Sequence, residues 1–153
     1  MSKTLLDLSV DEGLEPSPWN RITQDMINTF ADATGDHQWI HVDVEKCNKM
    51  SPFKTPIAHG FLSASLMPKA FESVITAHPE IASVLNYGIN NLRFLEPVRV
   101  NDSVRFIFKV ANIEQKSTGR LFTFDCAVEI EGREKPALIG QFLMLAVIRS
   151  ISH

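Results

Sequence analysis

The sequence predicts an α+β fold in which helices come first and antiparallel strands follow. Residues 24–34 and 59–76 place apolar side chains at helical spacing, whereas residues 104–110 and 122–130 alternate apolar and polar side chains. Alternation of period two is typical of half-buried strands, and elements segregated in this order favour a helix packed on one face of a sheet. The sequence shows no strand–helix alternation and no glycine-rich phosphate motif, which argues against a dinucleotide-binding fold.

The helices are expected in the first half of the chain. Thr23 is a suitable N-cap and Gly35 a suitable C-cap for a first helix of roughly ten residues. Asp43–Lys49 is expected to form a second, short helix. A third and longer helix is expected over about residues 59–76. Pro68 lies inside it and costs about 3 kcal/mol in a helix interior, so this helix either kinks there or is two helices.

Strands are expected from about Tyr87 onward. Turn residues at 117–119 and 131–133 separate the two alternating segments from each other and from the last strand. That last strand, Ala137–Ile148, is apolar on both faces. It is therefore either central in the sheet or covered by a second subunit.

The bulk composition is that of an ordinary globular protein. With 153 residues, 44% of them hydrophobic, the chain suits one domain with its own core, and we expect a single domain over residues 1–153. A formal net charge of −3 without a basic stripe argues against nucleic-acid binding. The sequence has neither a signal-peptide core nor an apolar run of roughly 18 residues, so we expect no membrane association and a cytoplasmic location. Cys47 and Cys126 are expected to be reduced thiols.

A polar cluster follows the first helix. Asp36, His37, His41 and Asp43 stand within eight residues, and Asp with His is the natural pair for proton transfer near neutral pH. The alternative is a polar loop in which Asp36 only caps a helix. The residues between the polar ones include Trp39, Ile40 and Val42. These apolar neighbours indicate that the cluster lies beside buried surface.

Two other chemistries have weaker support. His37 and His41 have the i, i+4 spacing of zinc ligands on a helix, but the metalloprotease motif needs Glu after the first His, and Gln38 stands there. Cys47 has no neighbouring base to activate it as a nucleophile. We therefore predict no metal site and no organic cofactor.

The segment from Ile57 to Ser65 is a second candidate site. His59–Gly60 begins the long helix, where free backbone N–H groups and the helix dipole favour a negatively charged oxygen such as that of a thioester in its transition state. The alternative is a plain helix start in which Gly60 is needed for packing. Ser63 and Ser65 do not fit the nucleophile-elbow pattern G-x-S-x-G.

A third segment, Asn86–Val98, is expected to form a strand that begins irregularly and ends at Pro97. Three polar residues on it face either a ligand or water: Asn90, Asn91 and Arg93.

Together these segments resemble a known family. Residues 30–43, FADATGDHQWIHVD, resemble the hydratase motif of MaoC-like proteins, the (R)-specific enoyl-CoA hydratases. Residues 57–66 resemble the start of that family's central helix, and residues 86–98 resemble the strand that follows it. The resemblance covers about residues 17–148 and is strongest to the nodulation-protein-N-like branch.

The resemblance implies a hot-dog fold, in which an antiparallel sheet wraps a long central helix, and a homodimer or higher oligomer. It places Asp36 and His41 in the family's catalytic positions and Ser65 in the position of a supporting serine. Further residues expected to bind substrate are Ala58, His59 and Gly60. One departure concerns residues 38–39, where Gln-Trp replaces the Asn-Pro of many members, so the acyl pocket is expected to differ in shape.

The implied activity is hydration of a trans-2-enoyl-CoA to the (R)-3-hydroxyacyl-CoA, and its reverse. Asp36 and His41 would hold a water that adds to the double bond, with CoA or acyl carrier protein as the thioester carrier. Two rival functions remain open, an acyl-CoA thioesterase of the same fold and a non-catalytic acyl-thioester binding protein.

Overall fold

The structure, a computed structural model, describes residues 3–149. Residues 1–2 and 150–153, the ends of the expected domain, lie outside the described residues. The helices are α1 Gln24–Thr34, α2 Trp39–Val42, α3 Val44–Met50, α4 Gly60–Ser65 and α5 Met67–Val74, after a 3-10 turn at Leu5–Asp7. The strands are β1 Asn20–Arg21, β2 Ile81–Phe94, β3 Ser103–Lys116, β4 Gly119–Ile130 and β5 Leu138–Ile148.

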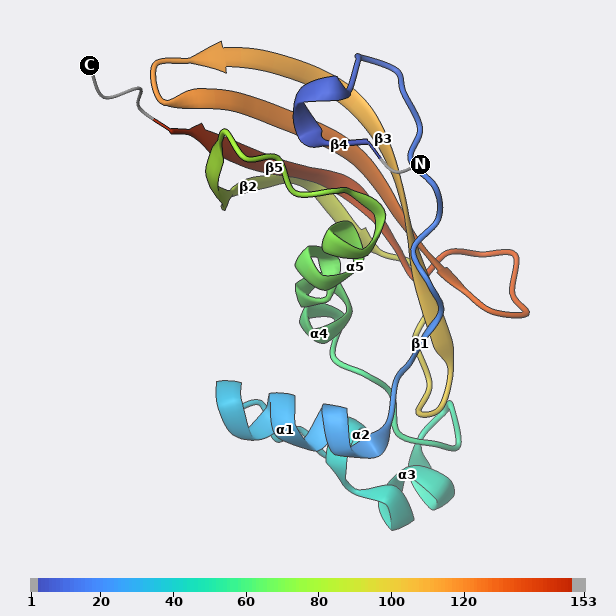
Figure 1. Cartoon of the computed structure of the whole chain (residues 1–153). Coiled ribbons are helices and arrows are strands. Elements are labelled where there is room, and N and C mark those ends of the chain that lie inside the picture. The colour runs from blue at the N-terminus through green and yellow to red at the C-terminus, as the bar shows by residue number, and fades with distance from the viewer. Residues whose placement is uncertain (1–2, 150–153) are drawn as a thin grey trace.

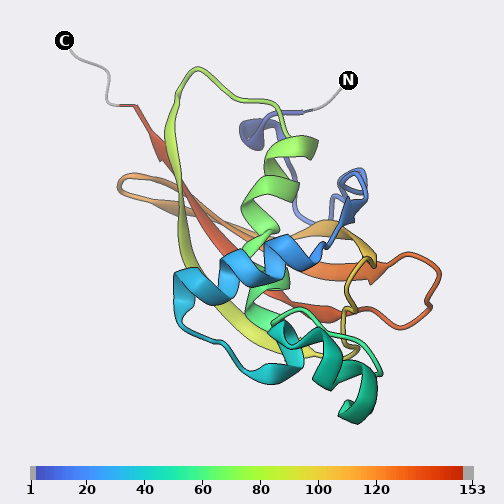
Figure 2. The same ribbon diagram turned by 90° about the horizontal axis from the view of Figure 1, so that it is seen from below.

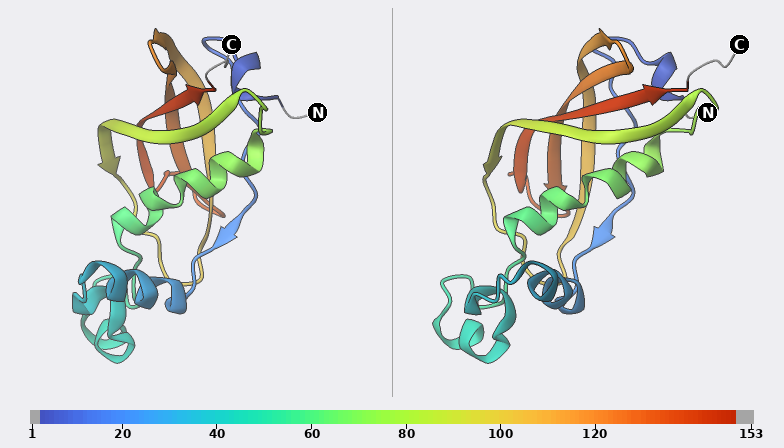
Figure 3. Two further views of the ribbon diagram at one scale, coloured as in Figure 1. Left: turned by 60° about the vertical axis from the view of Figure 1, so that its left-hand side comes forward. Right: turned by 90° about the vertical axis from the view of Figure 1, so that its left-hand side faces the viewer.

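The strands form one curved antiparallel sheet in the order β1-β3-β4-β5-β2. Helices α4 and α5 lie against its concave face, and α1 to α3 gather at one end of the sheet (Figures 1 and 3). Seen from below, α1 crosses in front of α4 (Figure 2). The α+β prediction is confirmed. No helix among residues 3–149 combines the length and the apolar character needed to cross a membrane.

The caps of α1 are those expected from the sequence. The Thr23 hydroxyl accepts a hydrogen bond from the Met26 N–H at 3.2 Å, and Gly35 ends the helix with a φ of 84°. A left-handed residue at this position is easily supplied by glycine, which has no Cβ to clash. The short helix α3 begins at a second cap, where the Asp43 carboxylate accepts from Lys46 N–H at 3.0 Å. Gly35 and Asp43 thus mark the two ends of the segment between α1 and α3.

The expected long helix is two helices. Leu66 separates α4 from α5, and Pro68 lies in the first turn of α5, where its missing N–H leaves no intrahelical bond unmade. The helix ends at Val74 rather than near Thr76. The predicted break at the proline is therefore confirmed in its two-helix form.

The position of β5 decides between the two expectations for it, because it lies between β4 and β2 and is central in the sheet. Strand β2 begins at Ile81, six residues before the expected start at Tyr87. Its residues are exposed on both faces, so period-two alternation is weak there, and three register shifts against β5 weaken it further.

Aromatic side chains join the helix to the sheet. Phe71 of α5 meets Phe108 edge-on at a centroid distance of 5.4 Å and Phe124 at 5.1 Å. All three are at least 95% buried, and Leu62 and Met67 extend the contact along the helices. Burial of such side chains contributes about 2 kcal/mol or more each. This packing holds the N-terminal end of α4 beside the loop that follows α1.

Candidate active site

The loop after α1 turns sharply and is held by its own side chains. After Gly35, the Asp36 carboxylate accepts a hydrogen bond from the Gln38 N–H at 3.3 Å. The single turn of α2 then places His41 on the inner side, where it is 6% exposed, while Asp36 remains exposed. The loop thus brings a carboxylate at the surface next to a buried imidazole.

One ring nitrogen of His41 is bound to the backbone. Nδ1 lies 2.7 Å from the carbonyl oxygen of Ile57, which accepts a hydrogen and so assigns the proton to Nδ1. Nε2 keeps a lone pair. Burial lowers the pKa of His41, and nearby His59 lowers it further, whereas the Ile57 carbonyl and Asp36 act in the opposite direction. The ring is therefore neutral near pH 7 and able to take up a proton.

His59 lies directly against His41. The two rings stack with centroids 3.8 Å apart, and Phe30 contacts the His59 ring at 4.8 Å. Nε2 of His59 lies 2.9 Å from the backbone oxygen of Asp36 and donates its hydrogen there. His59 immediately precedes α4, so the packing of that helix places this histidine on the loop of Asp36.

Asp36, His41 and His59 form one cluster, in which one side-chain atom from each lies within 4.8 Å of the other two. These are also the donor types of a transition-metal site. Zinc ligands at about 2.1 Å in tetrahedral geometry lie about 3.4 Å apart. The histidine pair at i, i+4 spacing is not the one assembled, because His37 forms an ion pair with Asp32 at 2.9 Å on the surface.

The residues around the start of α4 have different environments. A Cβ on Gly60 would lie 2.8 Å from the Phe94 ring, so glycine permits a close approach of these two elements. The N–H of Ala58 already donates to the Val98 oxygen at 2.7 Å and is not free for a substrate. Ser65 donates to the Leu62 oxygen at 2.7 Å, and its exposed side chain lines a cavity.

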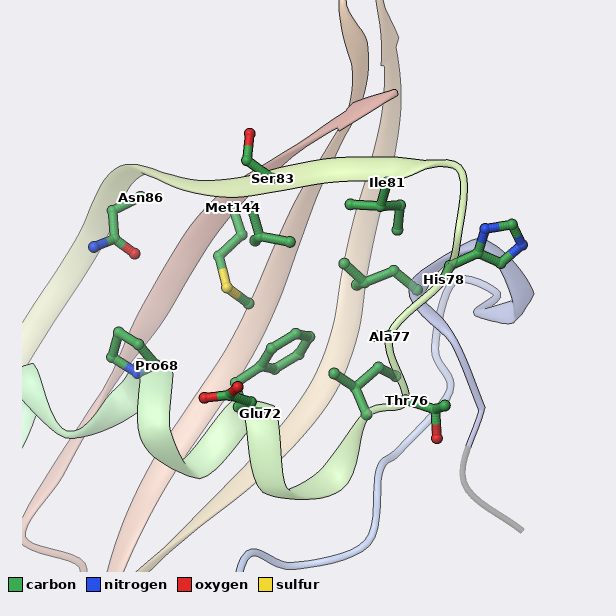
Figure 4. A pocket seen from close by; sticks show the side chains of 13 residues that line it. Pro68, Glu72, Thr76, Ala77, His78, Ile81, Ser83, Asn86 and Met144 are labelled. Carbon is green, nitrogen blue, oxygen red and sulfur yellow. The ribbon is translucent and has the colours of Figure 1, made fainter. Parts of the chain in front are cut away.

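That cavity, about 540 Å³ in volume, lies between the helices and β2. Its lining includes Phe30, Phe61, Ala64, Ser65, Met67, Tyr87, Ile89 and Phe142. A second cavity of about 370 Å³ continues along α5, and both are lined by Pro68 and Asn86. These two residues lie at the same end of the second cavity, and Met144 projects between helix and strand (Figure 4). The two cavities therefore adjoin at Pro68 and Asn86, and we refer to them together as the apolar groove.

The other residues singled out by sequence lie outside this arrangement. Asn90, Asn91 and Arg93 are exposed on β2, and the Asn90 amide contacts Gln141 of β5. Cys47 is fully buried, and burial raises the pKa of its thiol, which opposes the thiolate form that a nucleophile needs. Burial also raises the pKa of Cys126 to about 12, and both cysteines are free thiols as expected.

Sequence reasoning missed the contact between His59 and the polar cluster. His59 lies 18 residues from His41 along the chain, and only the fold stacks the two rings. The Ile57 carbonyl and the Phe30 ring were missed for the same reason. A histidine directly before a glycine at an expected helix start is the signal that the sequence offered.

The comparisons identify the class of protein. The family model described as "MaoC like domain" matches residues 7–128, so the chain belongs to the MaoC-like dehydratase family. It is 39% identical over 140 residues to 3-hydroxyacyl-thioester dehydratase Z of Mycobacterium tuberculosis, a match that covers 91% of each chain. It is also 39% identical over 146 residues to Nodulation protein N of Rhizobium meliloti, covering 94% of this chain and 91% of the relative.

The solved structures confirm the hot-dog fold. The R-hydratase PhaJ1 from Pseudomonas aeruginosa superposes with a TM-score of 0.76 at 22% identity, covering 99% of this chain and 93% of that one. The curved sheet around a helix is thus shared, and the expected family and branch are both supported by the relatives.

His37 and His41 are expected to have pKa values on opposite sides of 6.5, the pKa of a free histidine. The hydrogen bond that His37 donates to the Asp32 carboxylate raises the pKa of His37, whereas burial lowers that of His41. Imidazole NMR spectra recorded across a pH series measure both. Asp32→Asn should return His37 toward 6.5 and leave His41 unchanged; equal values for the two histidines would contradict the geometry.

Proposed function

We propose that this protein catalyses the reversible hydration of a trans-2-enoyl-CoA to the (R)-3-hydroxyacyl-CoA. The observation that carries the proposal is that a ring nitrogen of His41 and a carboxylate oxygen of Asp36 lie within 4.8 Å of each other, in a ring whose Nδ1 is bound to the Ile57 oxygen and whose Nε2 keeps its lone pair. The relative named 3-hydroxyacyl-thioester dehydratase Z supports a thioester substrate. Family membership supports hydration and dehydration as the chemistry.

The mechanism places one water between Asp36 and His41. The pair removes a proton as the water oxygen bonds to the β-carbon, and the electrons of the double bond move onto the thioester oxygen as an enolate. A proton then passes to the α-carbon, which restores the thioester and completes the addition of water.

The enolate oxygen needs a hydrogen-bond donor. At the start of α4 the N–H groups of Leu62 and Ser63 donate to the His59 oxygen, whereas those of Gly60 and Phe61 precede the first helical bonds and are suited to this role. Helix α4 is only six residues long, so its dipole contributes less than the long helix expected from sequence would, and the free N–H groups supply most of the interaction. Ser65 remains proposed as a supporting residue at the cavity wall.

The acyl group is proposed to lie in the apolar groove. The groove begins beside Phe30, which contacts His59, and it follows the helices from Ser65 to Ile75. Ten helical residues span about 15 Å, and an extended chain advances about 1.2 Å per bond, so the groove suits an acyl chain of roughly a dozen carbons. The carrier is proposed to be CoA or acyl carrier protein.

A homodimer or higher oligomer is proposed as the active form. Strand β2 ends the described sheet order, so one of its edges pairs with no other strand of residues 3–149. Large apolar side chains are exposed along it, at Val84, Leu85, Tyr87, Ile89 and Phe94. An exposed apolar edge strand is a site for pairing with another chain, here a second copy.

The catalytic proposal predicts that Asp36→Asn and His41→Ala each lower the turnover rate by at least about 10²-fold, the usual contribution of an acid–base group. Loss of enoyl-thioester absorbance with crotonyl-CoA and a longer trans-2-enoyl-CoA measures the rate. His37→Ala is the matched control, because His37 is exposed and paired to Asp32.

A thiol reagent in a parallel reaction distinguishes the hydratase from a thioesterase and from a non-catalytic binding protein. Loss of the double bond without thiol release supports the hydratase, and thiol release identifies a thioesterase. Binding of acyl-CoA without either reaction identifies a binding protein. Near-normal turnover in a folded Asp36→Asn variant would sink the catalytic assignment.

The groove proposal predicts that Val84→Trp shortens the acceptable acyl chain. Val84 pairs with the buried Ala146 and so faces the second cavity, which the indole would fill. We expect kcat/KM to fall at least about tenfold for trans-2-dodecenoyl-CoA, since each excluded methylene costs about 0.8 kcal/mol, with little change for crotonyl-CoA. Val10→Trp, at a similarly exposed valine, is the control. Equal losses for both substrates would refute the placement.

The dimer proposal predicts a particle of about twice the 17.2 kDa chain mass in sedimentation velocity. Leu85→Asp adds a charge to the exposed strand and should raise the dissociation constant at least about tenfold. Val10→Asp should leave it unchanged. A monomer at micromolar concentration would contradict the proposal.

A further inference from the structure

We propose that His59 is a third catalytic residue, whose Nδ1 accepts a hydrogen bond from the water that Asp36 and His41 activate. The inference rests on the proposed hydration and adds a role that the sequence did not assign, since His59 was expected only to bind substrate. It is carried by the hydrogen-bond pattern of the three side chains.

The tautomer of His59 is fixed by its hydrogen bond to the Asp36 backbone. Nε2 donates its hydrogen to the backbone oxygen of Asp36 at 2.9 Å, so in the neutral ring Nδ1 carries the lone pair. This Nδ1 is buried and has no hydrogen-bond partner among the described residues, in a side chain that is only 3% exposed. Buried acceptors are nearly always satisfied in folded proteins, so this atom calls for a donor from outside the chain.

The Asp36 carboxylate, Nε2 of His41 and Nδ1 of His59 are all hydrogen-bond acceptors. The Asp36 carboxylate accepts hydrogen bonds, and Nε2 of His41 accepts because its Nδ1–H is given to the Ile57 oxygen. None of these three acceptor atoms can therefore donate to another while both imidazoles are neutral and Asp36 is ionised. The arrangement requires a donor with more than one hydrogen, and a water has two.

The distances among the acceptor atoms of the cluster bear on whether one water can bridge them. Two acceptors that each lie about 2.8 Å from one water at a tetrahedral angle are about 4.6 Å apart. One nitrogen of each histidine and a carboxylate oxygen of Asp36 lie within 4.8 Å of one another, a limit that admits this spacing. Donors on one zinc ion would lie about 3.4 Å apart, so the distance between Nδ1 of His59 and Nε2 of His41 distinguishes a shared water from a metal ion.

The chemical consequence is control of the attacking water's orientation. One O–H bond points to the base pair of Asp36 and His41 and is broken during addition. The other points to Nδ1 of His59 and stays intact in the hydroxyl of the product. One of the two lone pairs of the oxygen is then directed at the β-carbon. His59 itself gains and loses no proton, and the atoms and electrons of the addition balance without it.

The two nitrogens of His59 can be tested separately. His59→Gln keeps an amide near the position of Nε2, able to donate to the Asp36 oxygen, and removes the Nδ1 acceptor. His59→Asn places its oxygen near the position of Nδ1 and loses the bond to Asp36. We expect His59→Gln to lower kcat about tenfold or more, the size of one strong hydrogen bond, with KM for crotonyl-CoA nearly unchanged.

His59→Asn is expected to keep a higher kcat than His59→Gln, although it breaks the bond to the Asp36 backbone. Thermal unfolding of both variants checks that they are folded. A kcat of His59→Gln near the wild-type value, or a lower kcat for His59→Asn than for His59→Gln, would overturn the proposal, because His59 would then only position the Asp36 loop.

A crystal structure of the wild-type protein provides a readout independent of activity and of variant folding. A water within hydrogen-bonding distance of Nδ1 of His59, Nε2 of His41 and the Asp36 carboxylate supports the inference; a metal ion there, or a water that Nδ1 does not contact, overturns it. Wild-type turnover and its loss in Asp36→Asn are the reference measurements. If they hold while His59→Gln remains active, the inference fails and the proposed hydration stands.

Discussion

The packing of α5 into the concave face of the sheet is the constraint on which the rest of the structure depends. Phe71 meets two phenylalanines of the sheet at 5.1 and 5.4 Å, and this contact fixes where the helix lies. Helix α4 precedes α5 with only Leu66 between them. The contact that places α5 therefore also sets the position of His59, just before α4. The reach of His59 to the Asp36 loop therefore follows from core packing.

Backbone carbonyls hold both site histidines in place. His41 donates to the Ile57 oxygen and His59 donates to the Asp36 oxygen. A carbonyl acceptor fixes the tautomer and the ring orientation, which leaves the other nitrogen of each neutral ring with its lone pair. Since the acceptors belong to the main chain, this arrangement is set by the path of the backbone and does not need further polar side chains in the core.

His37 and His41 show how burial separates residues of one motif. They are four positions apart in sequence, yet His37 is on the surface with a carboxylate partner and His41 is 6% exposed beneath the loop. The partner raises the pKa of the first, and burial lowers that of the second. Only the second combines neutrality near pH 7 with an unbound nitrogen, which are the properties that a general base needs.

The sequence by itself determined the elements whose causes are local. Thr23 and Gly35 bound α1, Pro68 divides the central helix, and alternation marks β3 and β4, because caps, proline and period-two burial act within a few residues. The Asp36–His41 pair was readable because both residues lie in one short loop. The tertiary structure alone decided the early start of β2, the central place of β5 and the stacking of His59 on His41. These depend on contacts between residues far apart in the chain, and sequence spacing carries no information about such contacts.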